Sequence, residues 1–327
     1  MNTRAAAVFA AAIALAVVPF FVPSALTFQL SQMVGLAIAL TGLNIFVGWA
    51  GQPTLAQGAM FALGAYATAI LCKAGVTWWL ALPLAGLAVG AFAMLLALPI
   101  LRLRHTYLAL ATFALALAVP QVLKHPALAG WTGGARGLEL DRPHAPAWLQ
   151  LDVSADAWMY WVALAVAVAV SVLVARVLAG RSGLALRAVR DNVFAAGAQG
   201  IHVSQVKNLA FCASGTLAAL GGGLYALNVQ YIGPESFQVF LSLTMLAALV
   251  VGGPGSAAGP WVGAALLQFV PSWAEAISTS APWAIFGFSV LLVVFVAPKG
   301  IAGSWRPLQA RLSHLRTRGV AVLKATR

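Results

Sequence analysis

The chain is a succession of apolar runs, each about long enough to cross a lipid bilayer as a helix. A helical crossing needs about 20 mainly apolar residues, and ten such runs follow one another, separated by glycine, proline or charged residues. The composition agrees, because 62% of the 327 residues are hydrophobic and only 8% are charged. A soluble protein of this size needs a larger charged surface around its core. The sequence therefore predicts an all-α, polytopic membrane protein with about ten transmembrane helices.

The apolar runs also predict the domain organisation. A transmembrane domain is expected over 1–303, followed by a basic cytoplasmic tail over 304–327. Two runs are short, so eight to eleven crossings are compatible with the sequence. The first 25 residues also have the order of a signal peptide, although the length of their apolar run favours a first crossing. The expected spans are 5–23, 27–48, 55–72, 78–100, 105–123, 158–179, 207–228, 237–252, 257–276 and 282–297.

The distribution of charge predicts the orientation of the chain. Lys and Arg concentrate on the cytoplasmic side of spanning helices. With ten crossings and a cytoplasmic N-terminus, 15 of the 19 basic residues fall inside and six of the seven acidic residues fall outside. An odd number of crossings would put the basic N-terminal and C-terminal segments on opposite faces and weaken this bias. We therefore expect both termini in the cytoplasm, and we attribute the net charge of +12 to topology rather than to nucleic-acid binding.

Residues that carry chemistry are scarce within the spans. No acidic or basic residue lies at the centre of an expected span, whereas proton- or sodium-coupled carriers usually place such residues at mid-membrane. The Gly-Lys dipeptide of a P-loop does not occur in the sequence, so any ATP hydrolysis must belong to a separate subunit. No histidines have a metal-ligand spacing on one helix face. We expect a transport pore without a catalytic residue, metal or cofactor.

A polar break interrupts the apolar sequence between the second and third runs. The segment AGQPTLAQG at 50–58 combines glycine, proline and uncharged polar residues. Unwound backbone at membrane depth is tolerated where it borders a cavity or pathway, and glycines in such runs also favour close helix packing. The sequence leaves both interpretations open. The residues expected to line a substrate pathway are Asn44, Gly51, Gln52, Thr54, Gln57 and Gly58.

Two loops are long enough to carry function. The outer loop, 124–157, contains four of the seven acidic residues together with tryptophans and prolines, which is typical of a short folded cap. The inner loop, 180–206, is rich in alanine, leucine and arginine and predicts one or two short helices at the cytoplasmic surface. It is either a docking surface for another subunit or an ordinary basic loop of the cytoplasmic face.

Six segments carry a pattern that extends, in order, over nearly the whole chain. They are GLNIFVGWAGQPTLAQGAMFALGAYATAIL (42–71), LRLRHTYLALAT (101–112), TGGARGL (132–138), GLALRAVRDNVFAAGAQGIHVSQVKNLAF (183–211), VVGGPGSAAGPWVGAALL (250–267) and PKGIAG (298–303). This pattern resembles the branched-chain amino acid ABC transporter permease family. The second and third segments favour the LivM branch over the LivH branch.

The resemblance implies the permease subunit of an ATP-driven importer in the bacterial inner membrane. The implied cargo is a branched-chain or other hydrophobic amino acid. The implied partners are a second, LivH-like permease, two ABC ATPase subunits and a periplasmic substrate-binding protein. A urea or amide permease of the same family is the alternative function, followed by a stand-alone secondary carrier.

The resemblance assigns a role to the inner loop, and the acidic and aromatic residues of the outer loop suggest a role for the cap. The resemblance implies that the inner loop couples to the ATPase through Arg187, Arg190, Asp191, Asn192, Ala195, Ala196, Gly200 and Ile201. The outer cap is expected to receive the substrate-binding protein at Thr132, Gly133, Gly134, Asp152 and Asp156. The sequence departs from the family pattern at Val193 and Gly197, where relatives often have an acid, and at Gln57, where histidine is usual.

Overall fold

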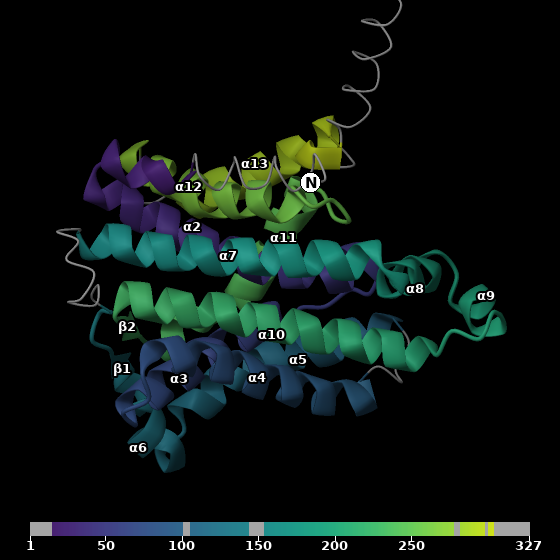
Figure 1. Cartoon of the computed structure of the whole chain (residues 1–327), viewed down its shortest axis with the longest axis horizontal. Coiled ribbons are helices and arrows are strands. Elements are labelled where there is room, and N and C mark those ends of the chain that lie inside the picture. Colours follow the sequence, from purple (N-terminus) through teal and green to yellow (C-terminus); the bar gives the residue numbers. More distant parts are fainter. Residues whose placement is uncertain (1–14, 101–104, 144–153, 278–281, 298–299, 304–327) are drawn as a thin grey trace, which may run out of the picture.

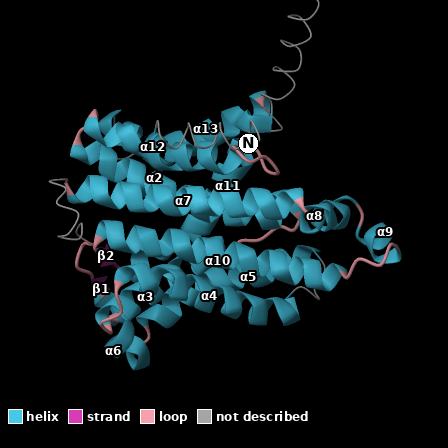
Figure 2. Cartoon of the chain, in the orientation of Figure 1, coloured by secondary structure: helices cyan, strands magenta, loops and turns pink. Residues whose placement is uncertain are grey.

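The computed structural model describes residues 15–100, 105–143, 154–277, 282–297 and 300–303. Within these ranges the chain is almost entirely helical, as Figure 2 shows. Most of the first expected span, 5–23, and the whole basic tail, 304–327, lie outside the described residues.

The long helices run along the bundle and the short elements lie at its two ends. The long helices are α2 (Ser24–Leu43), α3 (Gln57–Lys73), α4 (Trp78–Ile100), α5 (His105–Lys124), α7 (Ala155–Ala179), α10 (Val203–Val229), α11 (Val239–Gly252), α12 (Gly259–Ile277) and α13 (Pro282–Val296). The short helices are α6 (Ala129–Thr132), α8 (Arg181–Asp191) and α9 (Val193–Ala198). Two short strands, β1 (Leu138–Glu139) and β2 (Tyr231–Ile232), pair antiparallel.

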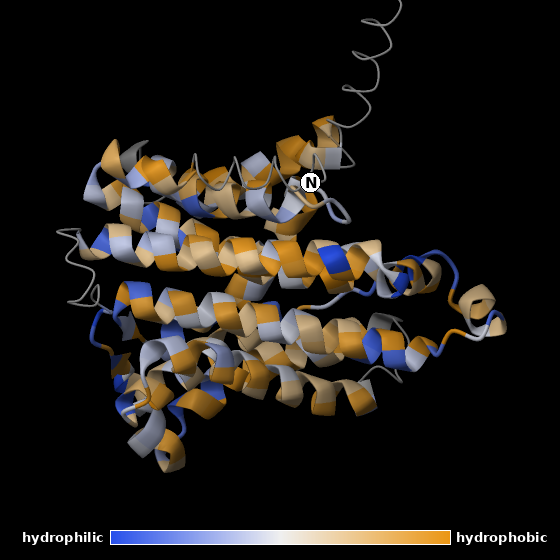
Figure 3. Cartoon of the chain, viewed as in Figure 1, coloured by the Kyte–Doolittle hydropathy of each residue, from blue (hydrophilic) through white to orange (hydrophobic). Residues whose placement is uncertain are grey.

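Six helices in the described part of the chain are long and apolar enough to cross a membrane. Each falls on one of the expected spans, and apolar residues cover most of their length (Figure 3). Helices α3, α11 and α12 lie on three further expected spans. The structure confirms an all-α polytopic architecture, with one pair of two-residue strands added. The total of about ten crossings and the cytoplasmic location of both termini stay predictions. The six helices are Ser24–Trp49, Trp78–Pro99, Tyr107–Lys124, Ala155–Ala179, Val203–Val229 and Pro282–Gly303.

Helix α10 is the centre of the bundle, where it packs against α2, α3 and α4. Glycines allow these backbones to approach closely. A Cβ atom at Gly222 would overlap the carbonyl oxygen of Phe61 in α3, and one at Gly64 would overlap the backbone of Ala219 in α10. Small residues at helix contacts are the usual means by which membrane helices associate. At these positions the glycines therefore allow close helix packing, which is one of the two roles that the sequence left open for glycines in the apolar runs.

The two long loops lie at opposite ends of the bundle. Helix α6 and the strands β1 and β2 lie at one end, and α8 and α9 extend beyond the other (Figure 1). Helix α7, with 25 residues, connects the two ends and rises about 37 Å at 1.5 Å per residue. That length exceeds the hydrocarbon thickness of about 30 Å. The arrangement suits loops that face the two sides of a membrane.

The close approach of α3 and α10 generates the first prediction. Replacing Gly222 by alanine puts a methyl group against the Phe61 carbonyl oxygen, a backbone atom that cannot move alone. We expect Gly222→Ala to lower the free energy of unfolding by about 1–3 kcal/mol, the usual effect of overpacking. The measurement is the thermal unfolding midpoint in detergent.

The matched control for this substitution is Gly35→Ala in α2. Its added Cβ would lie 3.4 Å from the Gly221 carbonyl oxygen, an ordinary van der Waals contact. We expect this variant to unfold close to the wild-type midpoint. Equal midpoints for the two variants would contradict the assigned packing of α3 on α10.

Candidate functional site

The polar break between α2 and α3 is a helix interruption, which is one of the two interpretations that the sequence left open. Helix α2 continues into a π-helix, η2 (Asn44–Trp49), after which residues 50–56 are not helical. Gly51 has a φ of +67°, in the left-handed region that favours glycine. Single π-helical turns occur frequently at functional sites. The candidate site is therefore the π-helix together with the unwound segment 50–56.

Asn44 joins the π-helix to the turn between α11 and α12. Its side-chain oxygen accepts a hydrogen bond from the Gly255 N–H at 2.7 Å, and its Nδ2 donates to the Ser256 carbonyl oxygen at 2.8 Å. Asn44 is 3% exposed. Its amide therefore satisfies two backbone groups of a buried turn. Asn44 also lines a largely apolar cavity of about 380 Å³ beside Trp49 and Trp261.

Gln57 connects three helices at the beginning of α3. Its Nε2 donates to the Ala39 carbonyl oxygen of α2 at 2.6 Å, and its Oε1 accepts from the Ser214 hydroxyl of α10 at 3.0 Å. The next residue, Gly58, donates its N–H to the Ser242 hydroxyl of α11 at 3.0 Å. These hydrogen bonds fix the position at which α3 begins.

The unwound segment obtains its hydrogen bonds from nearby side chains and backbone. The Leu55 N–H donates to the Thr112 hydroxyl of α5 at 3.0 Å. Thr54 accepts from the Ala56 N–H through its side-chain oxygen at 3.2 Å, and Gln52 donates to the Ala50 carbonyl oxygen at 3.3 Å. The polar side chains expected to line a pathway are thus buried and bonded within this chain. Their role in a substrate pathway stays a prediction.

The inner loop forms two short helices, which confirms that expectation. The Asn192 side-chain oxygen begins α9 by accepting from the N–H groups of Phe194 and Ala195, each at 3.0 Å. Ala196 is buried against the rest of the loop. After α9, Gly200 has a φ of +82°, and the Ile201 N–H returns to the Ala196 carbonyl oxygen at 3.1 Å. Four of the expected coupling residues, Asn192, Ala196, Gly200 and Ile201, therefore stabilise the fold of the loop itself.

The remaining expected coupling residues divide into two groups. Asp191 and Ala195 are exposed on the surface of the loop. Arg187 and Arg190 instead approach the candidate site: Arg190 Nη1 donates to the Gly48 carbonyl oxygen at 2.7 Å, and the Arg187 guanidinium lies 4.8 Å from the centre of the Trp49 ring. A cation is favourable near these final carbonyl groups of a helix.

Phe194 is a residue that the sequence patterns did not single out. It lies in α9 and is 89% exposed, at the part of the loop that extends furthest from the bundle (Figure 1). A phenylalanine inside an alanine-rich loop segment gives no periodic signal of its own. An exposed aromatic side chain at such a place is typical of an interface anchor.

The TGG segment at 132–134 stabilises the fold of the outer cap. The Thr132 hydroxyl lies 2.8 Å from the Leu123 carbonyl oxygen and accepts from the Gly134 N–H at 3.2 Å. Gly133 has a φ of +71°, and a Cβ atom there would overlap the Gly137 carbonyl oxygen. These three expected docking residues therefore hold the cap together. Their contact with a partner stays a prediction.

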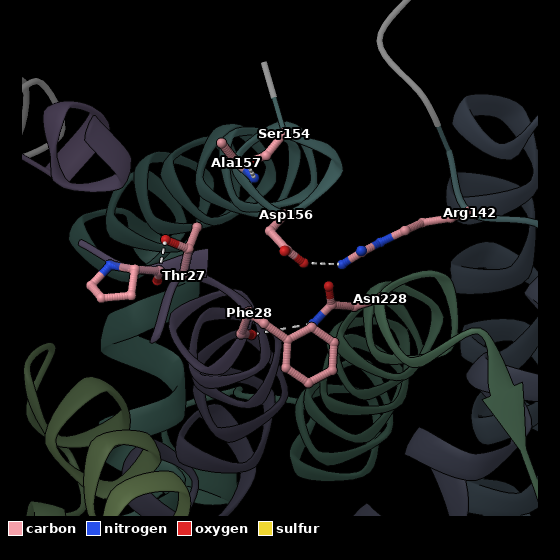
Figure 4. Close-up of polar contacts among 8 residues, drawn as sticks. Thr27, Phe28, Arg142, Ser154, Asp156, Ala157 and Asn228 are labelled. Carbon is pink, nitrogen blue, oxygen red and sulfur yellow. Dashed lines mark hydrogen bonds and ion pairs between the residues drawn. The ribbon is translucent and has the colours of Figure 1, made fainter. Parts of the chain in front are cut away.

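An ion pair between Arg142 and Asp156 anchors the cap to α7 (Figure 4). The two side chains are 18% and 20% exposed. The Arg142 guanidinium also lies 5.9 Å from the ring centre of Phe28 in α2, and Asn228 Nδ2 of α10 donates to the Phe28 carbonyl oxygen at 3.3 Å. Asp156, an expected docking residue, is thus already paired within the chain. Asp152 lies outside the described residues.

A second ion pair, between Lys124 and Glu235, lies at the same end of the bundle. The hydrogen bonds that Glu235 accepts from Lys124 and Gln238, together with the Lys124 charge, hold the pKa of its carboxyl group below the ordinary value. Because Glu235 is exposed, this pair contributes little to stability.

The described residues contain no cluster of three or more His, Cys, Asp or Glu side chains that could hold a metal ion. The chemistry available at the helix break is instead a set of neutral amides and hydroxyls, with two arginines at its edge. Together with membrane-length helices, these features define a polytopic membrane protein with a polar helix break in its interior.

Comparison with known proteins identifies the family. The family described as branched-chain amino acid transport system / permease component matches residues 25–297. The high-affinity branched-chain amino acid transport system permease protein LivM of Salmonella typhimurium is 30% identical over 298 residues, which cover 85% of this chain and 70% of LivM. LivM of Escherichia coli K12 matches to the same extent. No solved structure was found to match.

Two other relatives match over shorter lengths. The autoinducer 2 import system permease protein LsrC of Photorhabdus laumondii is 29% identical over 48% of this chain and 46% of its own. A probable branched-chain amino acid transport permease protein LivH of Methanocaldococcus jannaschii is 29% identical over 40% of this chain and 44% of its own.

The chain belongs to the branched-chain amino acid transport permease family. It is a multi-pass protein of the bacterial inner membrane and a permease component, which is not itself an enzyme.

Asn44 provides the second prediction. Asn44→Leu leaves the Gly255 N–H and the Ser256 carbonyl oxygen without their side-chain partner in a buried turn. An unsatisfied buried polar group costs about 1–3 kcal/mol, so we expect a clear fall in the thermal unfolding midpoint. The control is Ser289→Ala, because the Ser289 hydroxyl donates to the Ile285 carbonyl oxygen within its own helix. A midpoint for Asn44→Leu as high as that of the control would contradict the bridging role.

Proposed function

We propose that the chain is the permease subunit of an ATP-driven importer for branched-chain or other hydrophobic amino acids. The proposed partners are a second, LivH-like permease, two ABC ATPase subunits and a periplasmic binding protein that delivers the substrate. The observation that carries this proposal is the α8–α9 loop, which extends beyond the bundle at the end opposite the cap and leaves Phe194 exposed.

The buried polar groups support a neutral or zwitterionic cargo. Charged residues in the described membrane-length helices lie near their ends, as with Asp156 and Arg176 of α7 and Lys207 of α10. A net charge without a partner is expensive inside a bilayer. The charges of an amino acid cancel, and amides and hydroxyls can bind it without a buried counter-ion. In the described membrane-length helices no Asp, Glu, Lys, Arg or His lies at mid-helix, which favours an external source of energy over ion coupling.

The proposed mechanism is alternating access driven from the α8–α9 loop. ATP binding closes the ATPase dimer, and the docked loop moves with it. Phe194 is the anchor, because a large aromatic side chain loses water contact over its whole surface when it enters a partner's pocket. The helices then change from facing the binding protein to facing the cytoplasm.

Reconstitution in vesicles tests the function directly. We expect leucine uptake only when the second permease, the ATPase subunits, the binding protein and ATP are all present. Uptake by this chain alone, driven by an ion gradient, would contradict the proposal and favour a secondary carrier. Uptake of urea or acetamide in place of leucine would identify the alternative cargo.

Phe194 provides the third prediction. Phe194→Ser removes an exposed ring and no packing within the described chain, so the variant is expected to fold normally. We expect it to lose most ATPase co-purification and to reduce uptake at least about tenfold, as loss of an interface anchor does. Substitutions at Ala196 or Gly200 are less informative, because Ala196 is buried and Gly200 has a positive φ.

Trp131 offers a matched control for Phe194. It is 68% exposed and lies in α6, at the opposite end of the bundle. We expect Trp131→Ser to retain wild-type ATPase co-purification. Equal ATPase binding by Phe194→Ser and wild type would show that Phe194 is not the anchor.

A further inference from the structure

The side chain of Arg190 lies against three glycine backbones from separate segments. Its Nη1 donates to the carbonyl oxygen of Gly48, in the last turn of the π-helix, at 2.7 Å. A Cβ atom at Gly51 would lie 2.9 Å from Arg190 Cγ, and one at Gly255 would lie 3.0 Å from Nη1. Arg190 thus contacts the π-helix, the beginning of the unwound segment and the turn between α11 and α12.

The Arg190 contact has a clear physical basis. The final carbonyl groups of a helix lack partners within the helix, and a guanidinium donor forms a charge-assisted hydrogen bond with them. Arg187 precedes Arg190 by three residues and therefore lies on the same face of α8. Its guanidinium stacks on Trp49, the residue after Gly48. Two successive arginines of α8 thus hold the end of the π-helix.

Further hydrogen bonds connect this point to the rest of the bundle. Asn44, at the beginning of the same π-helix, holds Gly255 and Ser256. Leu55, at the far end of the unwound segment, is held by Thr112 of α5. A displacement of α8 at Gly48 therefore reaches the α11–α12 turn and α5 through direct contacts.

The segment that receives this displacement is suited to change shape. A π-helix can exchange its i→i+5 hydrogen bonds for the i→i+4 bonds of an α-helix, which shifts the following residues. Ala50 still donates its N–H to the Ile45 carbonyl oxygen and Ala56 still accepts from the Met60 N–H, but the structure shows no i→i+4 or i→i+5 backbone hydrogen bond at the described residues 51–55 that would resist such a shift. An element that can adopt two hydrogen-bonding patterns can therefore respond to a small displacement by changing from one conformation to the other.

We propose that Arg190 is a positioning residue that transmits movement of the α8–α9 loop to the polar break, through its hydrogen bond to the Gly48 carbonyl oxygen. The source of that movement rests on the proposed function. The role assigned to Arg190 differs from ATPase contact, because its guanidinium donates a hydrogen bond to the π-helix of its own chain.

The test compares Arg190→Gln with wild type in the complete reconstituted complex, with ATP hydrolysis and leucine uptake measured in the same vesicles. We expect hydrolysis within about twofold of wild type and uptake reduced at least about tenfold, so that the amount of ATP hydrolysed per leucine rises. Arg190→Lys keeps the charge and a donor and is expected to restore part of the coupling. Arg181→Gln, at the exposed beginning of the same helix, is the control and is expected to behave as wild type.

Backbone amide exchange over 50–56 gives a second measurement that a purely structural role would not produce. We expect ATP to change this exchange in the wild-type complex and to leave it unchanged in the Arg190→Gln complex. An unaltered ratio of hydrolysis to uptake in Arg190→Gln, or equal losses of both activities, would overturn the inference. If Arg190→Gln does not fold, an Arg190→Lys complex that hydrolyses more ATP per leucine than wild type supports the inference, and one with the wild-type ratio of hydrolysis to uptake overturns it.

The wild-type complex separates the two hypotheses. Absence of ATP-dependent uptake in wild type contradicts the proposed function, and the transmitting role of Arg190 falls with it. Coupled uptake in wild type that persists in Arg190→Gln contradicts the role of Arg190 alone.

Discussion

Satisfying backbone polar groups away from water is the constraint on which this structure depends. A membrane helix satisfies its own N–H and carbonyl groups, whereas a break in a helix releases them. The break at 50–56 is stabilised by side chains from other elements: Thr112 of α5 binds Leu55, Ser242 of α11 binds Gly58, and Arg190 of α8 binds Gly48. The positions of these three helices around the break follow from this requirement.

Between helices surrounded by lipid, the hydrophobic effect does not drive association, and close packing provides the favourable interaction instead. Lipid tails are as apolar as leucine, so helices associate through shape and polar contacts. Gly64 and Gly222 bring the backbones of α3 and α10 together, and Gln57 then reaches both α2 and α10 with one side chain. The position of α3 thus depends on Gly64 and Gly222, which leave room for the two backbones to approach, and on the Gln57 amide, which fixes where α3 lies along α2 and α10.

The sequence predicted the features that are local and missed those that depend on distant partners. Hydropathy locates helices because each span is continuous, and the AGQPT segment marks the break by its own residues. Thr112 and Ser242 bind residues that are 57 and 184 positions away, so no local pattern indicates them. Arg190 was expected to couple to the ATPase because of the family resemblance, and Asp156 was expected to bind the delivery protein because the outer cap is rich in acidic and aromatic residues. Their inward contacts, with Gly48 and Arg142, arise only from the packing of α8 and α7.

The chemistry of the Arg190 contact suits a link that is made and broken during each transport cycle. A buried ion pair that loses one partner leaves an uncompensated charge, which costs about 3–5 kcal/mol. The Gly48 carbonyl is neutral, and Arg190 lies at an exposed position of α8, so water can replace Gly48 as the partner of the guanidinium when the two separate. The free energy of separation is then nearer to that of one hydrogen bond to a charged group, about 1.5–3 kcal/mol. Such a contact is strong enough to transmit a displacement and weak enough to be released.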